Sequence, residues 1–100
     1  MEDQSLVLKP CVYILELEDE CWYVGITLNL NVRLGQHWAG QGSNWTKLHK
    51  PLRLVEVLYP GTQMLENDVC QTLILEFGAD KVKGGYSCKP NKALPKWFKQ

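Results

Sequence analysis

The sequence lacks the features that mark membrane and secreted proteins. It has no apolar run near the roughly 20 residues that a bilayer-spanning helix needs, and residues 1–5 carry neither the basic nor the apolar region of a signal peptide. The four cysteines include no Cys-x-x-Cys pair and no nearby histidine cluster that would suit a metal. We therefore expect an intracellular protein with free thiols and no membrane partner, located in the cytoplasm, the nucleoid or a eukaryotic nucleus.

The chain also has no net charge at neutral pH. The chain has 11 basic and 11 acidic residues, which argues against a protein that binds nucleic acid over its whole surface. The charges are nevertheless uneven, because every acid lies at or before Asp80, whereas residues 81–100 hold six lysines and no acid. This pattern predicts a basic C-terminal tail, which either attracts phosphate groups or simply keeps the chain soluble.

The chain is too short for several domains. With 100 residues, of which 45% are hydrophobic, it predicts one domain over 1–100 that buries a modest core of its own. No zinc-finger or helix-turn-helix pattern is appended to it. Any preference for a particular target must therefore come from the domain itself, from its tail, from self-association or from a separate partner.

Two short apolar segments organise the chain. Pro10–Leu17 and Cys21–Thr27 are rich in Val, Ile and Tyr and predict two strands, joined by the acidic residues Glu18–Glu20. If all three acids form the loop, Tyr13 lies opposite Gly25, and the tyrosines of the two strands share one face of the sheet. A two-residue loop would send the tyrosines to opposite faces. Both tyrosines also suit the simpler interpretation of ordinary β-forming residues.

The rest of the pattern predicts an α+β fold with a small antiparallel or mixed three-stranded sheet flanked by helices. Asn29 and Thr62 are suitable helix caps, and Gly78 is a suitable helix end. The predicted elements after the hairpin are a helix over Leu30–Trp38, a surface loop over 39–51, a strand over Leu52–Tyr59, a helix from Thr62 to about Phe77, and a short strand or loop over 81–87.

Arg33, His37 and Glu66 are the candidate reactive residues on these helices. Arg33 and His37 are four residues apart and so lie one turn apart on the same side of the first helix. Because that helix directly follows the second strand, we expect both side chains to reach back over the hairpin. Glu66 shares a helix face with Val69 and Leu73, where a carboxylate is costly to desolvate unless a cation or donor meets it.

A second set of candidates lies in the segment 39–51. It mixes glycines, basic residues and one tryptophan, a composition that suits contacts to a sugar-phosphate backbone. The alternative is that the tryptophan pins the loop onto the core. The predicted nucleic-acid-binding residues are Trp45, Thr46, Lys47, His49 and Lys50, together with Lys83 farther along the chain.

Several ordered motifs together resemble the GIY-YIG nuclease domain. The resemblance covers roughly residues 10–86 and implies a nuclease-like core over 9–87, followed by the basic tail over 88–100. Two positions depart from the family pattern: Cys11 replaces the first glycine, and Ile26 stands where some relatives carry a lysine. The motifs that carry the resemblance are Cys11-Val12-Tyr13, Tyr23-Val24-Gly25, Arg33, His37, 42–46, Lys50-Pro51 and Met64-Leu65-Glu66.

The resemblance implies a metal-dependent DNA endonuclease and a role for each catalytic candidate. Glu66 matches the glutamate that binds Mg²⁺ or Mn²⁺, and Arg33 matches the arginine that stabilises the attacked phosphate. Tyr13 and Tyr23 match the two motif tyrosines, one of which acts as general base. We favour Tyr13, with His37 as its helper.

The implied substrate is DNA, duplex or branched, in a repair or recombination process. The protein would act as a homodimer or with a separate targeting protein. One alternative is a module of the same fold that binds nucleic acid or a partner with little or no turnover. Another is a purely structural domain, in which Glu66 forms a salt bridge with Arg33.

Overall fold

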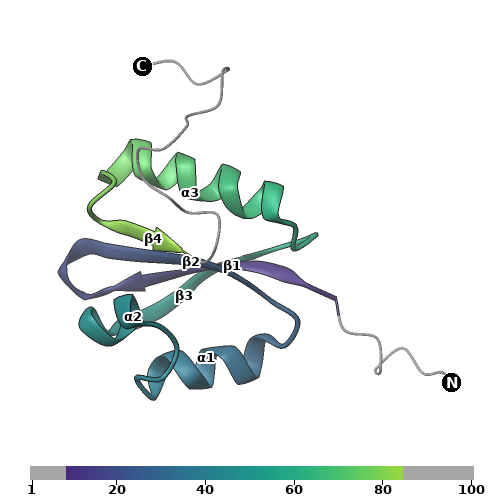
Figure 1. Ribbon diagram of the computed structural model, residues 1–100, viewed down its shortest axis with the longest axis horizontal. Helices are drawn as coiled ribbons and strands as arrows, with labels where there is room; N and C mark the ends of the chain where they lie inside the picture. The colour runs from purple at the N-terminus through teal and green to yellow at the C-terminus, as the bar shows by residue number, and fades with distance from the viewer. Residues whose placement is uncertain (1–8, 85–100) are drawn as a thin grey trace, which may run out of the picture.

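This protein consists of a mixed sheet with helices on both faces (Figure 1). The structure is a computed structural model, and it describes residues 9–84. The strand order is β3-β1-β2-β4. Helices α1 and α2 cover one face of the sheet, and α3 covers the other (Figure 1). The α+β class is therefore confirmed. Residues 85–87, which we expected to continue a strand or loop, and the predicted tail over 88–100 lie outside the described residues.

The central hairpin has the predicted register. Strands β1 (Cys11–Leu17) and β2 (Cys21–Thr27) are antiparallel, with Tyr13 opposite Gly25 and Leu17 opposite Cys21. Glu18–Glu20 form the loop between them. The three-residue loop is thus confirmed, and it puts both tyrosines of the hairpin on the same face of the sheet.

The sheet has one strand more than the three we expected. Strand β3 (Pro51–Leu58) pairs antiparallel with β1. Strand β4 (Val82–Gly84) adds a parallel pair to Trp22–Val24 of β2, and the side chain of Val82 is fully buried there. Within residues 9–84, the pairing with β4 covers Trp22–Val24 of β2.

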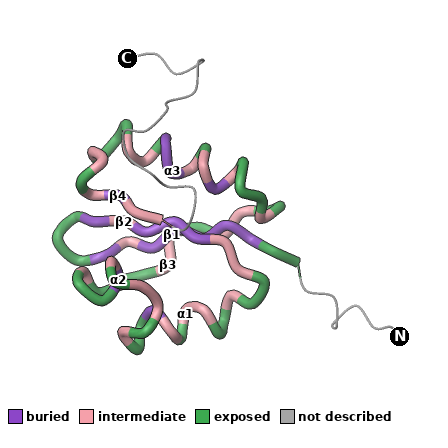
Figure 2. The backbone as a smooth tube through the Cα atoms, in the orientation of Figure 1, coloured by how far each residue is buried: buried purple, intermediate pink, exposed green. Residues whose placement is uncertain are grey.

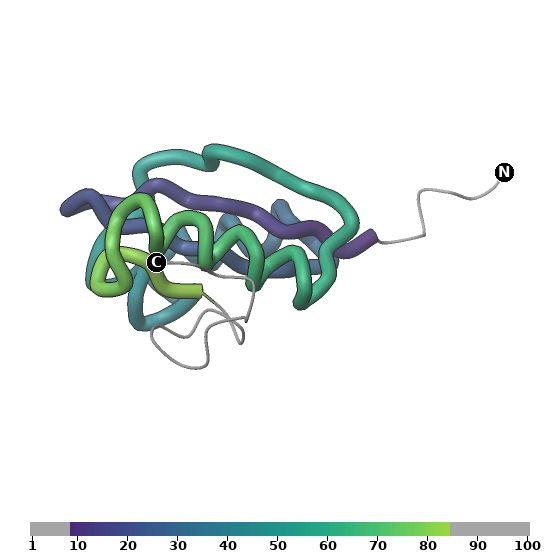
Figure 3. Tube along the Cα trace, turned by 90° about the horizontal axis from the view of Figure 1, so that it is seen from above, coloured from purple at the N-terminus to yellow at the C-terminus, as the bar shows by residue number. Residues whose placement is uncertain are grey.

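Two of the helices begin directly after the capping residues predicted from the sequence. In α1 (Leu30–Trp38), the Asn29 side chain accepts a hydrogen bond from the Val32 amide at 3.2 Å. In α3 (Gln63–Phe77), the Thr62 side chain accepts one from the Leu65 amide at 3.0 Å. Seen from above, α3 runs lengthwise over the sheet (Figure 3).

The prediction of a continuous surface loop over 39–51 is wrong. Residues Asn44–Leu48 form a short helix, α2. Ser43 caps it, because its side-chain oxygen accepts a hydrogen bond from the Thr46 amide at 3.1 Å. The ring of Trp45 packs against the core beneath the sheet and holds this single turn in place.

The strands of the hairpin separate two apolar clusters, and β1 is the most deeply buried element (Figure 2). On the α3 face the cluster contains Val12, Ile14, Val24, Cys70 and Val82. On the face of α1 and α2 it contains Tyr13, Leu15, Leu17, Cys21 and Tyr23. The two tyrosines therefore belong to the core on one side, with their hydroxyl ends near its edge.

The cysteines are in two states. Cys11 and Cys21 are free and buried, as predicted. Cys70 is disulfide-bonded, so the prediction of a free thiol is wrong for that residue, and Cys88 lies outside the described part of the chain. No helix within residues 9–84 is both long and apolar enough to cross a membrane.

Candidate active site

A cavity of about 460 Å³ lies against the second half of β2, where Gly25 and Ile26 line it. Both tyrosines of the hairpin, Arg33 of α1 and Glu66 of α3 contribute to its walls. The arginine comes from one face of the sheet and the glutamate from the other. The complete lining is Tyr13, Tyr23, Gly25, Ile26, Arg33, Gly61, Gln63 and Glu66.

Two glycines in the cavity wall allow close packing, one against the phenol of Tyr13 and one against the start of β1. The rings of Tyr13 and Tyr23 lie side by side, with their centroids 6.1 Å apart. A Cβ atom at Gly25 would lie 2.5 Å from the Tyr13 hydroxyl oxygen, a distance that no real side chain tolerates. Gly61 is equally constrained, since a Cβ there would overlap the backbone of Pro10 and Cys11. These two positions admit only glycine without a local shift.

His37 lies behind Tyr13 and does not line this cavity. It is fully buried, and its Nε2 atom is 2.8 Å from the Tyr13 hydroxyl. Its Nδ1 atom is 2.9 Å from the Thr46 hydroxyl, which is itself 3.0 Å from the Ser43 hydroxyl. The result is a buried chain of polar groups that leads from the cavity to the first turn of α2.

The surroundings keep both His37 and Tyr13 neutral at neutral pH. Burial and the nearby Arg33 cation lower the pKa of His37 to about 4. Burial, supported by the neighbouring Tyr23 phenol, raises the pKa of Tyr13, although Arg33 acts in the opposite direction. Tyr13 is therefore a neutral phenol that shares a hydrogen bond with a neutral imidazole.

Arg33 is held in place by two hydrogen bonds from its guanidinium. One goes to the side-chain oxygen of Gln36 at 2.8 Å and the other to the carbonyl oxygen of Gly42 at 3.0 Å. Burial alone would lower the pKa of Arg33, but the interactions with Tyr13 and Tyr23 outweigh it and raise the pKa. The group stays charged beside both phenols, where it can meet an anion.

Glu66 brings one carboxylate to the cavity from the first turn of α3. Its side chain is 2% exposed. Within the described residues, the guanidinium of Arg33 bonds Gln36 and Gly42 and forms no ion pair with Glu66. The salt bridge of the purely structural alternative is therefore not observed.

The donor set fits a hydrated Mg²⁺ or Mn²⁺ ion better than a closed metal cage. Residues 9–84 contain no group of three or more His, Cys, Asp or Glu side chains that could enclose a metal. Mg²⁺ commonly takes only one or two protein carboxylates and keeps several waters. Glu66 offers one carboxylate, Gln63 offers an amide oxygen one helical turn earlier, and the cavity has room for water and a phosphate.

The predicted nucleic-acid-binding residues do not form one group. Trp45 anchors α2 to the sheet, since its indole N–H donates to the carbonyl of Trp22 at 2.9 Å. The ammonium of Lys83 lies 5.1 Å from the centre of the Trp45 ring, and the ring of His49 contacts its edge. Thr46 is buried against His37.

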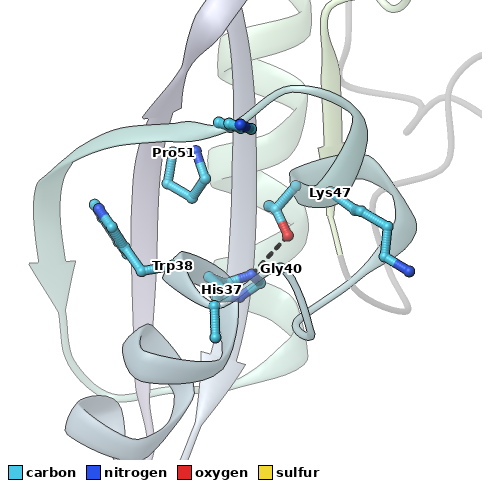
Figure 4. A pocket seen from close by; sticks show the side chains of 8 residues that line it. His37, Trp38, Gly40, Lys47 and Pro51 are labelled. Atoms are coloured by element: carbon cyan, nitrogen blue, oxygen red, sulfur yellow. Dashed lines mark hydrogen bonds between the residues drawn. The ribbon is translucent and has the colours of Figure 1, made fainter.

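Lys47 and Lys50 lie elsewhere, at a second cavity of about 340 Å³. Both are exposed. His37 and Thr46 also line this cavity (Figure 4). The Tyr13–His37 hydrogen bond therefore joins a residue of the first cavity to a residue of the second.

Sequence reasoning missed one residue of the site and gave another a different role. Gln63 lines the cavity three positions before Glu66, and the i, i+3 spacing on a helix was the available signal. Thr46 was assigned to the surface, whereas its hydroxyl supports His37.

Sequence comparison agrees with this geometry. The GIY-YIG catalytic domain matches residues 9–64, a stretch that includes both tyrosines, Arg33 and His37 but ends before Glu66. UPF0213 protein BH0048 of Halalkalibacterium halodurans is 43% identical over 44 residues, which are 44% of this chain and 47% of that protein. UPF0213 protein SH2523 of Staphylococcus haemolyticus is 40% identical over 47 residues, 47% of this chain and 57% of that protein.

The matched segment thus spans about half the length of these relatives. No solved structure matches the chain significantly. The family match covers more than half of the 100 residues and includes the hairpin and α1. The resemblance found in the sequence is confirmed, and the chain belongs to the GIY-YIG catalytic domain family.

Proposed function

We propose that this domain is a divalent-metal-dependent DNA endonuclease that hydrolyses phosphodiester bonds. The observation that carries the proposal is the joint position of Tyr13, Tyr23, Arg33 and Glu66 around one cavity. Phosphodiester hydrolysis needs a base for water, a cation on the phosphoryl oxygens and stabilisation of the developing charge. These four side chains can meet all three requirements.

Tyr13 is the proposed general base, acting through His37. Its raised pKa argues against a phenolate before substrate binds. The phenol instead takes a proton from the attacking water as it passes its own proton to Nε2 of His37, 2.8 Å away. The water oxygen bonds to phosphorus as the bond from phosphorus to the leaving sugar oxygen breaks, and that oxygen takes a proton from solvent. His37 is neutral because its pKa is about 4, and in the tautomer that carries its proton on Nδ1, toward Thr46, Nε2 is free to accept the proton of Tyr13.

Arg33 and Tyr23 bind the phosphate in this mechanism. The guanidinium is fixed by Gln36 and Gly42, so it is already oriented before an anion arrives. It neutralises charge that grows on the phosphoryl oxygens, which is where preorganised cations contribute most to rate. The hydroxyl of Tyr23 donates a further hydrogen bond from the same wall of the cavity.

Glu66, with the amide oxygen of Gln63, is the proposed Mg²⁺ or Mn²⁺ site. A bound cation would polarise the phosphoryl oxygen and lower the pKa of coordinated water. Before binding, Glu66 is oriented by its place in the first turn of α3, close to the positive end of the helix dipole.

Cleavage of a panel of labelled DNAs tests the proposal. The panel contains single-stranded, nicked, branched and fully duplex molecules, each with and without Mg²⁺ or Mn²⁺. We expect cation-dependent cleavage of at least one DNA by the wild-type chain and its loss in Glu66→Gln. Binding without cleavage would favour the non-catalytic binding module instead. Equal cleavage by wild type and Glu66→Gln would remove Glu66 from the mechanism.

A further inference from the structure

The second cavity, beside His37, has walls that differ from those of the proposed active site. Its volume is about 340 Å³, and it lies between the end of α1, helix α2 and the start of β3 (Figure 4). Trp38 and Pro51 form its apolar wall, and Lys47 and Lys50 lie on its polar side. None of the residues that line it is acidic.

The two lysines are cations without a protein partner among residues 9–84. Neither Lys47 nor Lys50 forms a side-chain hydrogen bond or ion pair within that stretch, and both are exposed. Other basic residues are engaged: Arg53 pairs with Glu16 at 2.6 Å, and Lys83 lies over Trp45. The carboxylate of Glu18 accepts a hydrogen bond from the Lys50 amide at 3.3 Å but does not line the cavity. Two lysines in the wall itself favour an anionic ligand.

The cavity also has an exposed aromatic surface. Trp38 is 48% exposed, and it lines the cavity next to Pro51. An adjoining hollow of about 370 Å³, which shares Gly40 and Lys47 with the first, likewise has no acidic residue in its wall. A flat ring beside cations is the combination that holds an unpaired base and its phosphate.

We propose that the cavity formed by Trp38, Lys47 and Lys50 binds an unpaired nucleotide of the DNA strand. The base stacks on Trp38, and the flanking phosphates bind the two lysines. This inference rests on the proposed endonuclease function and specifies its substrate as DNA with a single-stranded segment. An unpaired nucleotide is required because bases inside a duplex present no free face for an aromatic ring.

The position of the cavity suits a strand that continues into the active site. His37 forms part of its floor and bonds Tyr13 at 2.8 Å, and Tyr13 lines the active-site cavity. Arg33 and Trp38 lie on the same short helix, five residues apart. A strand that crosses this helix would place one nucleotide at Trp38 and a neighbouring phosphodiester near Arg33.

Binding without cleavage tests the inference separately from the nuclease activity. The full chain carrying Glu66→Gln, without divalent cation, is titrated into fluorescent ten-nucleotide oligothymidylate and into a blunt duplex of equal length, and anisotropy is recorded at several salt concentrations. We expect Trp38→Ala to weaken single-strand binding about fivefold or more and duplex binding less than twofold. Trp38→Phe should restore most of the lost affinity, because it keeps an aromatic face.

The lysines are tested by the double substitution Lys47→Gln and Lys50→Gln. It should lower the slope of log affinity against log salt by about 1.4 for the single strand, at roughly 0.7 per phosphate contact. The matched control removes two positive charges elsewhere, in Arg53→Gln and Lys81→Gln, and should change that slope by less than half as much.

Three results would overturn the inference. The first is equal loss of single-strand and duplex binding in Trp38→Ala. The second is an equal effect of the two double variants on the salt slope. The third concerns a short acidic peptide titrated in the same assay: Trp38→Ala and the double lysine variant bind this peptide more weakly but bind DNA as before. If no DNA of any form binds the wild-type chain, the proposed function fails as well, so the two failures are distinguishable.

Discussion

At the scale of single residues, glycines decide how closely the reactive groups approach the backbone. A Cβ atom at Gly25 would lie 2.5 Å from the Tyr13 hydroxyl, and one at Gly42 would overlap the ring of His37. Neither glycine has a left-handed backbone conformation, so glycine is needed at both positions because a side chain would not fit. The two glycines therefore set the positions of the proposed base and its hydrogen-bond partner.

Substitution of Gly25 by alanine tests this role. The added methyl group forces the Tyr13 phenol aside, so we expect a loss of about 1–3 kcal/mol in unfolding free energy and loss of cleavage. Urea denaturation and a cleavage assay measure the two effects. The control is Gly35→Ala, since no atom lies within 4 Å of a Cβ built there. It should leave cleavage intact and add roughly 0.5–1 kcal/mol of stability. Wild-type behaviour of Gly25→Ala would contradict the account.

Thr46 holds the imidazole of His37 in the orientation that Tyr13 needs. Thr46→Val keeps the side-chain shape but removes the hydroxyl 2.9 Å from Nδ1, so the balance of the two neutral tautomers should change, and single-turnover cleavage should fall roughly tenfold. Nitrogen-15 NMR of the histidine ring reports the tautomers directly. Thr46→Ser should restore both readouts. An unchanged ring spectrum in Thr46→Val would exclude this positioning role.

The lowered pKa of His37 makes stability depend on pH. The folded value is about 4 and the unfolded value about 6.5, so below pH 6.5 the unfolded chain binds the additional proton. The free energy of unfolding must then fall as pH drops from 6.5 toward 4, by roughly 2–3 kcal/mol from this group. Urea denaturation of the wild type and of His37→Gln over this range measures it. Parallel pH profiles of the two proteins would contradict the prediction.

Much of the site was predictable at the residue scale, because loop length and strand alternation are local properties. The three-residue loop put Tyr13 and Tyr23 on one face, as found. The buried hydroxyl of Thr46 was not predictable in the same way. Its environment depends on the packing of Trp45 against a strand more than 20 residues away, which no local pattern records.

At the scale of elements, helix caps were the most informative signals. Asn29 and Thr62 begin α1 and α3 where the sequence indicated. The five-residue helix α2 escaped prediction because a single turn has too few residues for a visible period. Strand β4 could not be distinguished from a loop, since its three residues gain order only through distant pairing with β2.

The cap of α3 also affects the proposed site, because Glu66 lies in the first turn that Thr62 stabilises. Thr62→Ala removes the acceptor of the Leu65 amide and should lower the unfolding free energy by about 1 kcal/mol. The apparent affinity for Mn²⁺ should fall with it, because the first turn frays. Thr62→Ser keeps the acceptor and serves as the control. Equal stability of the alanine and serine variants would show that this cap contributes nothing.

At the scale of the whole molecule, the sheet brings together groups that are far apart in the sequence. Arg33 arrives on α1 from one face and Glu66 on α3 from the other (Figure 1). They meet beside Gly25 and Ile26, in the second half of β2. The family pattern implied these residues, but only the strand order explains why they share a cavity.

Nuclear relaxation by Mn²⁺ tests most directly whether this cavity is one cation site. Mn²⁺ is added to the nitrogen-15-labelled chain, and line broadening is measured for each backbone amide. We predict the strongest broadening at Gly25, Ile26, Gly61 and Gln63, which line the cavity beside Glu66, and its loss in Glu66→Gln. Broadening centred elsewhere, or unchanged in Glu66→Gln, would contradict the proposal that these groups form a single metal-dependent site.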